Sequence, residues 1–118
     1  MRLTATAFLV LLAACAGPGD LVPRTLHLGV VGQTEWDEFS KFPDASRLDL
    51  KFAARPNEKE QALFIRQDNV KRVWPVELNG RRLGTLISQE MPTVCTLAVP
   101  PGSLVDGVNT LSVVPPRE

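Results

Sequence analysis

The stretch that decides the fold is Trp74-Pro75-Val76-Glu77-Leu78-Asn79-Gly80-Arg81-Arg82-Leu83. Its first half alternates, with Trp74, Val76 and Leu78 on one face, which is the period of a half-buried β-strand. Asn and Gly tolerate the two positive φ angles of a type I′ turn, so Asn79-Gly80 predicts a tight hairpin. Pro75 has no N–H to donate, so its backbone position is not a central ladder donor.

Further short strand-like runs lie on both sides of this hairpin. Residues 48–52 alternate strictly between apolar and charged, and residues 62–65 form a continuous apolar run typical of a covered or central strand. Other strands are expected over 26–31, 82–87, 94–99 and 110–114, whereas 33–39 is either a strand or a loop. Proline and glycine turn signals separate these runs. About six or seven short strands predict an all-β fold, an antiparallel sandwich or barrel.

The N-terminus has the pattern of an export signal. A basic Arg2 precedes the apolar run 3–12, and the small residues Ala13 and Ala14 lead to Cys15. The apolar run is shorter than the about 20 residues that a membrane-crossing helix needs. Leu12-Ala13-Ala14-Cys15 resembles the lipobox of bacterial lipoproteins, which implies cleavage before Cys15 and lipidation of its thiol. Acyl chains at Cys15 would hold the domain at a membrane.

Ordinary secretion is the alternative, because Ala14-Cys15-Ala16 also fits the A-x-A cleavage pattern. An uncleaved buried helix is a third reading. The lipobox interpretation divides the chain into a signal helix over 1–14, a tether over 15–25 and a β-sandwich domain over 26–114. Residues 115–118, which begin with a proline pair, form the start of a linker or a C-terminal tail. The protein is therefore expected outside the cytoplasm, in the cell envelope or secreted.

Charge and cysteine content exclude some function classes. The chain has 13 basic and 13 acidic residues, a balance that gives no electrostatic footprint for nucleic acid. If Cys15 is acylated, Cys95 stands alone and no internal disulfide forms. Cys95 lies in the apolar run 94–99, where a free cysteine usually behaves as a small buried hydrophobe. A catalytic thiol would need a base, and the chain has a single histidine, His27.

The segment from about Leu26 to Val114 resembles the galactose-binding-like jelly-roll domains. The resemblance is carried by W-P-V-E-L-N-G over 74–80, L-G over 83–84 and V-P-P-G-S-L-V-D-G-V-N-T-L over 99–111. It implies a jelly-roll β-sandwich of the kind that binds sugars in glycoside hydrolases. In this pattern Leu104 plugs the core from a loop, Gly107 permits a tight turn, and Asn109 caps loop backbone groups.

A narrower resemblance adds residues 55–60 and 65–71. With the turn motifs, they are similar to the domain that precedes the metallohydrolase in CehA/McbA-type proteins of the PHP superfamily. This resemblance implies that a catalytic domain would follow. Its metal centre needs several histidines, so no catalytic residue is carried over to this chain, and no cofactor or metal is expected here.

The tryptophans are the natural candidates for a sugar platform, because an indole stacks on the apolar face of a pyranose. Trp74 is in register with Val76 and Leu78, which favours a core position. Trp36 lies in a polar stretch, with Gln33 and Glu35 as its expected hydrogen-bonding partners.

The acidic residues offer weaker candidates. Asp37 and Glu38 are adjacent, so in an extended segment they point to opposite faces and cannot share one substrate. A structural calcium near Asp44 or Asp106 has no support from spacing.

The sequence therefore favours an exported, lipid-anchored, non-catalytic β-sandwich that binds carbohydrate or a partner protein domain. One alternative is the N-terminal fragment of a CehA/McbA-type envelope metallohydrolase whose catalytic part is absent. The other is a structural envelope lipoprotein.

Overall fold

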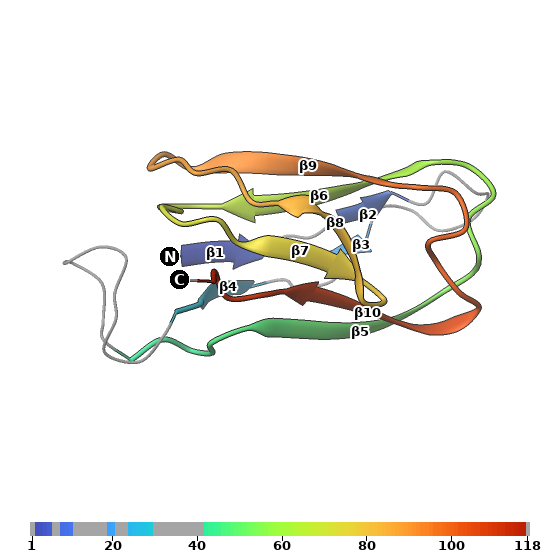
Figure 1. Ribbon diagram of the computed structural model, residues 1–118, viewed down its shortest axis with the longest axis horizontal. Helices are drawn as coiled ribbons and strands as arrows, with labels where there is room; N and C mark the ends of the chain where they lie inside the picture. Colours follow the sequence, from blue (N-terminus) through green and yellow to red (C-terminus); the bar gives the residue numbers. More distant parts are fainter. Residues whose placement is uncertain (1, 6–7, 11–18, 21–23, 30–41, 118) are drawn as a thin grey trace.

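The computed structural model describes residues 2–5, 8–10, 19–20, 24–29 and 42–117. These residues are all-β, with antiparallel strands and no helix (Figure 1). The strands are β1 (Arg2–Ala5), β2 (Phe8–Val10), β3 (Gly19–Asp20), β4 (Arg24–His27), β5 (Leu48–Ala54), β6 (Gln61–Gln67), β7 (Pro75–Leu78), β8 (Arg81–Thr85), β9 (Thr93–Val99) and β10 (Gly107–Val113). Within these ranges no helix is long and apolar enough to cross a membrane. The predicted all-β antiparallel class is confirmed.

Two four-stranded sheets and one two-stranded sheet make up the described fold. The first sheet has the order β5-β10-β7-β8, the second has the order β3-β2-β6-β9, and β1 pairs with β4. The chain crosses between the larger sheets four times, from β5 to β6, β6 to β7, β8 to β9 and β9 to β10. The first and last of these connections lie at one end of the strands, and the other two lie at the opposite end (Figure 1).

The hairpin predicted at Asn79-Gly80 is confirmed. Asn79 has φ 51° and Gly80 has φ 79°, so both turn residues take the positive angles of a type I′ turn. Pro75 is the first residue of β7, where its missing N–H costs the ladder little. A β-bulge lies between Val76 and Glu77 in the pairing of β7 with β8.

The core lies between the two larger sheets. In β5 the alternation predicted from the sequence holds, with Leu48, Leu50 and Phe52 packed against the core and the charged residues exposed. Trp74 is 1% exposed, so it is a core residue rather than a ligand platform. The sheets approach closely at Gly84, where an added Cβ would lie 2.8 Å from Leu97 Cδ2. The fully buried large side chains are Trp74, Leu28, Leu63, Leu78, Leu104, Leu111, Gln67, Val70, Val76 and Val99.

Asn57 ties together the two connections at one end of the sandwich. It lies on the β5–β6 connection and is 5% exposed. Its Nδ2 donates to the carbonyls of Lys59 (3.0 Å) and Pro100 (2.8 Å), and its Oδ1 accepts from the Leu104 amide at 3.0 Å. Its own carbonyl accepts from the Gly102 amide at 2.8 Å. These bonds hold the β9–β10 loop so that Leu104 enters the core, where it is 1% exposed.

Two further asparagines, Asn79 and Asn109, hold the same loop. Asn109 is fully buried, and its Nδ2 donates to the carbonyls of Val105 (2.9 Å) and Gly107 (3.2 Å). Its Oδ1 accepts from the Val105 amide and from Asn79 Nδ2, both at 2.8 Å. Asn79 Nδ2 also donates to Ser103 O at 3.2 Å. The roles that the sequence motif suggested for Leu104 and Asn109 are thus confirmed.

Gln67 makes the corresponding tie at the opposite end. This residue of β6 is 1% exposed, and its carboxamide bonds both backbone groups of Ile87 on the β8–β9 connection. The Ile87 amide donates to Gln67 Oε1 at 2.8 Å, and Gln67 Nε2 donates to the Ile87 carbonyl. Val70 and Gln89 form a backbone bridge beside this pair, with N···O distances of 3.0 and 2.8 Å. A glutamine side chain therefore joins the end of β6 to the β8–β9 connection.

Some expected elements differ in the structure. The signal helix over 1–14 is not confirmed, because Arg2–Ala5 and Phe8–Val10 are the strands β1 and β2. Strand β2 pairs with β6 antiparallel, with Phe8 opposite Phe64 and Val10 opposite Ala62. The strand expected over 26–31 is found as β4, which ends at His27 and is followed by a bridge between Leu28 and Ala45. The possible strand over 33–39 lies outside the described residues.

Replacing Leu104 with Ala is expected to lower the free energy of unfolding by about 2–5 kcal/mol, because it leaves a cavity between the sheets. Val105→Ala is the matched control, since Val105 is 47% exposed, and its effect should stay within about 0.5 kcal/mol. Urea unfolding followed by tryptophan fluorescence measures both values. Equal effects of the two substitutions would contradict the assigned role of Leu104.

Candidate functional site

The residues chosen from the sequence as ligand contacts, Trp36, Gln33 and Glu35, lie outside the described residues, and so does the lipidation candidate Cys15. Their roles stay predictions. The adjacent acids Asp37 and Glu38 also lie outside the described ranges.

His27 and Asp44 are brought together by the backbone. The His27 amide donates to Asp44 Oδ2, and the Asp44 amide donates to the His27 carbonyl, both at 2.8 Å. Asp44 therefore caps the end of β4. Among the described residues, no group of three or more His, Cys, Asp or Glu side chains is placed to hold a metal ion.

Cys95 lies inside the sandwich and is 2% exposed. Its Sγ donates to the Thr85 carbonyl at 3.5 Å, which links β9 to the end of β8. Burial raises the pKa of the Cys95 thiol above its ordinary value, because the thiolate would lose its hydration. The residue has the environment of a small buried hydrophobe, as the sequence indicated.

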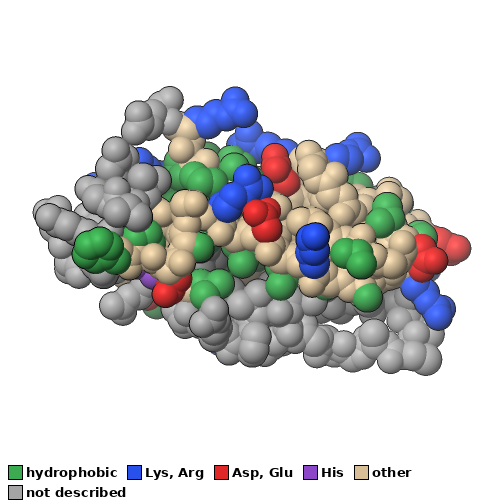
Figure 2. Space-filling view, turned by 90° about the horizontal axis from the view of Figure 1, so that it is seen from below, with side chains coloured by type: hydrophobic (Ala, Val, Ile, Leu, Met, Phe, Trp, Pro, Cys, Tyr) green, Lys and Arg blue, Asp and Glu red, His purple; other side chains and the backbone are tan. Residues whose placement is uncertain are grey.

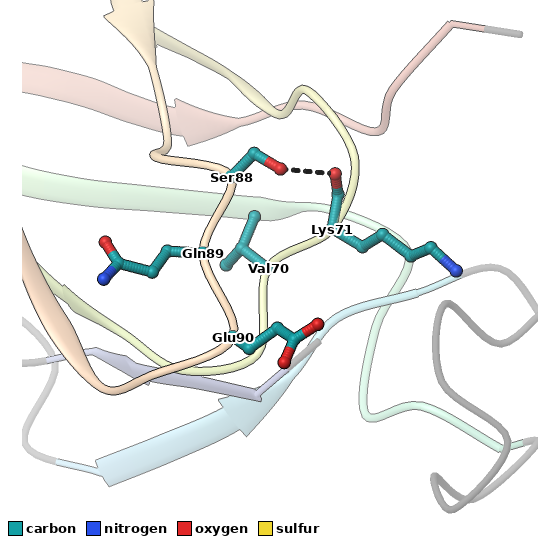
Figure 3. Close-up of a pocket in the computed structure, with 5 residues that line it drawn as sticks. All are labelled: Val70, Lys71, Ser88, Gln89 and Glu90. Atoms are coloured by element: carbon teal, nitrogen blue, oxygen red, sulfur yellow. Dashed lines mark hydrogen bonds between the residues drawn. The ribbon is translucent and has the colours of Figure 1, made fainter.

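An open hollow of about 400 Å³ lies at the Gln67 end of the sandwich. It is lined by Val70, Lys71, Ser88, Gln89 and Glu90, which come from the β6–β7 and β8–β9 connections (Figure 3). The Ser88 hydroxyl donates to the Lys71 carbonyl at 2.8 Å, which fixes the two connections relative to each other. In the close-up the side chains of Lys71 and Gln89 point to opposite sides. Lysine, glutamate, serine and glutamine therefore border the hollow, but their side chains do not all point to one place.

A second hollow, of about 270 Å³, is lined by Arg66, Gln67, Pro92, Thr93 and Val94. It lies at the same end of the strands, because the end of β6 and the start of β9 border it. Exposed apolar side chains are found on the same connections: Val73 is 57% exposed and Met91 is 67% exposed. This end of the sandwich therefore combines polar hollows with apolar surface.

The outer face of the first sheet carries a different polar cluster. Asp49 on β5 accepts from the Ser112 hydroxyl at 2.6 Å and from the Arg47 guanidinium at 2.8 and 2.9 Å. Hydrogen bonds to the carboxylate lower the pKa of Asp49 below its ordinary value; the bond from the Ser112 hydroxyl has the larger effect and the bond from Arg47 the smaller. Figure 2, which views the molecule from below, shows charged side chains of both signs intermingled on the surface that it presents. The Asp49 cluster is satisfied internally and is not part of either hollow.

No sequence pattern indicated the hollow at Lys71 and Glu90. The segment 88–90 contains ordinary polar residues between a predicted strand and the Met91-Pro92 break, and the Lys71-Arg72 pair is typical of a solvated turn. In the structure, the pairing of Val70 with Gln89 and the Ser88–Lys71 hydrogen bond bring the two segments together.

Comparison of the chain with protein-family models, curated proteins and solved structures gives no match.

The Cys95 thiol is expected to resist alkylation in the folded protein, because burial blocks access and the raised pKa keeps the thiol protonated at neutral pH. The measurement uses the Cys15→Ser variant, so that Cys95 is the only thiol, and compares labelling by a maleimide with and without denaturant. Labelling of the folded protein as fast as that of free cysteine would contradict the burial.

Proposed function

We propose that this chain is an exported, lipid-anchored β-sandwich that binds a neutral carbohydrate and has no catalytic role of its own. The observation that supports it best is the hollow at Lys71, Ser88, Gln89 and Glu90, which lies between two mutually hydrogen-bonded connections.

The side chains around this hollow suit a polyhydroxyl ligand. A sugar hydroxyl both donates and accepts, so different hydroxyls of one oligosaccharide can bond an ammonium group, a carboxylate or an amide. Charges of opposite sign favour a neutral ligand over an anion or a cation. Because the hollow is open rather than enclosed, it fits one face of an extended oligosaccharide better than a small molecule that must be surrounded.

The frame behind the hollow also favours binding. The Gln67 carboxamide and the Val70–Gln89 bridge fix the backbone of both connections, so little ordering accompanies ligand contact. The resemblance to galactose-binding-like domains and the polar stretch around Trp36 point to the same class of ligand.

The non-catalytic role rests on the sequence. A CehA/McbA-type arrangement places the metal centre in a following domain, and this chain has one histidine, which cannot supply the several that such a centre needs. The structural-lipoprotein alternative differs from the proposal in requiring no ligand at all.

Binding of the full chain to a glycan array tests this proposal. Glu90→Ala is expected to weaken binding to any glycan that scores by at least about tenfold, since a hydrogen bond to a charged group contributes about 1.5–3 kcal/mol. Glu58→Ala is the matched control, because Glu58 is an exposed glutamate on the β5–β6 connection at the opposite end.

A second variant, Trp36→Ala, separates the sequence-based site from the hollow. If Trp36→Ala and Glu90→Ala each abolish binding when made separately, the result supports a single binding surface that includes both residues. Binding to no glycan would overturn the carbohydrate proposal and leave the structural-lipoprotein alternative ahead.

The anchor is tested by metabolic labelling with a fatty-acid analogue in a bacterial host. The label is expected on the full chain, to be lost in Cys15→Ser and to persist in Cys95→Ala, because only the lipobox thiol would be acylated. Retention of the label in Cys15→Ser, or its absence from the unaltered chain, would argue against the lipobox.

A further inference from the structure

We propose that β9 is the pairing edge of a symmetric dimer, in which two copies of this chain join their second sheets through antiparallel β9 strands. This inference goes beyond ligand binding and does not depend on it.

The edges of the two larger sheets differ in how well they are protected. An exposed edge strand invites pairing, and proteins usually block it with charges, irregular geometry or very short strands. Strand β5 exposes Asp49 and Lys51, β8 carries two exposed arginines beside a bulge, and β3 has only two residues. Each of these three edges carries a feature that opposes pairing.

Strand β9 carries none of these features. Its seven residues, T-V-C-T-L-A-V, include no charge and no proline, and they pair with β6 in a continuous register without a bulge. Val94 is 47% exposed, and Thr96 and Ala98 are also exposed. In the described part of the chain, β9 has β6 on one side and no strand on the other. Figure 1 shows it as the upper border of the molecule.

Strand β8 does not cover this open edge. The side chains of β9 that point inward are the ones that meet β8, because Leu97 lies over Gly84 and Cys95 Sγ reaches the Thr85 carbonyl. Strand β8 therefore belongs to the facing layer. The N–H and C=O groups on the other edge of β9 keep regular strand geometry and pair with no described strand.

The sequence of β9 suits a second copy of itself. A two-fold axis at Thr96 sets the two Thr96 residues opposite each other, a pair type that is favourable across antiparallel strands. The same register sets Val94 opposite Ala98, and Cys95 opposite Leu97. Every pair is uncharged, so no like charges meet, and each large side chain on the outer face lies opposite a small one. The two-fold contact is closed, so it produces a dimer and not a fibre.

The ends of the strand also fit this register. If the pairing continues past Val99, it carries Pro100 of the second copy toward Pro92, at the border of the hollow lined by Arg66, Pro92 and Val94. The exposed Arg81 and Arg82 of β8 lie toward the end of β9 at Val99. The two-fold axis therefore places the two arginines of one copy at the opposite end of the contact from those of the second copy. The joined edge is small, so the dimer is expected to be weak and concentration-dependent.

Sedimentation of the full chain with Cys15→Ser, over a range of concentrations, tests the dimer. We expect a monomer–dimer equilibrium that Thr96→Lys weakens more than about tenfold, because the two lysines would face each other across the axis. Ala53→Lys is the matched control: it adds the same charge to an exposed position of β5 and should leave the equilibrium unchanged. Thermal unfolding of each variant reports whether the monomer is still folded.

A cysteine scan tests the register independently of folding losses in Thr96→Lys. In the Cys15→Ser background, Thr96→Cys is expected to form a disulfide-linked dimer, since directly opposed residues lie about 4.5–5.5 Å apart between Cα atoms. Ala98→Cys should not, because its counterpart in the second copy is roughly 13 Å away along the strand. A chain that stays monomeric at every concentration, a dimer indifferent to Thr96→Lys, or equal cross-linking of the two cysteine variants would overturn the proposal.

Discussion

Two buried carboxamides, Asn57 and Gln67, hold the connections between the two large sheets in place. Each end of the sandwich has two crossing connections. Asn57, on the β5–β6 connection, bonds backbone groups of the β9–β10 connection, and Gln67, at the end of β6, bonds those of the β8–β9 connection. A carboxamide has the same donor and acceptor as a peptide group. It can therefore bond backbone N–H and C=O groups that have no neighbouring strand to pair with. Among the described residues no buried side-chain nitrogen or oxygen lacks a partner. An unsatisfied group of this kind would cost about 1–3 kcal/mol, which is a large part of a small domain's stability.

The two ends are closed to different degrees. At the Asn57 end, Asn79 and Asn109 add further bonds to the β9–β10 loop, and Leu104 fills the space between the sheets. At the Gln67 end the two connections are also joined, by the Val70–Gln89 bridge and by the Ser88–Lys71 hydrogen bond, but polar side chains there border an open hollow. The first end is built for packing, whereas the second leaves surface available for contact. A binding function therefore belongs more naturally to the Gln67 end.

The edge strands of the two larger sheets also differ in how strongly they oppose pairing with another strand. Charges on β5 and the bulge beside β8 limit pairing on the first sheet, and β9 remains regular and uncharged on the second. Its inward side chains, among them Leu97 and Cys95, pack in the core, and within the described residues no strand pairs with its other edge. The proposed ligand contact at the hollow and the proposed pairing at β9 would use neighbouring but separate parts of the molecule.

Local rules account for what the sequence determined by itself. The alternation in β5 and the positive φ angles of Asn79-Gly80 were predicted, because each depends on residues close in the chain. The insertion of Leu104 was expected from the resemblance of its loop to a known turn motif. The tertiary structure alone decided the partners of Asn57 and Gln67 and the hollow at Lys71 and Glu90. These features join segments 17 or more residues apart, as in the pairs Lys71–Ser88, Gln67–Ile87 and Asn57–Leu104. Which distant segments meet depends on sheet order, and no local pattern of apolar and polar residues specifies that order.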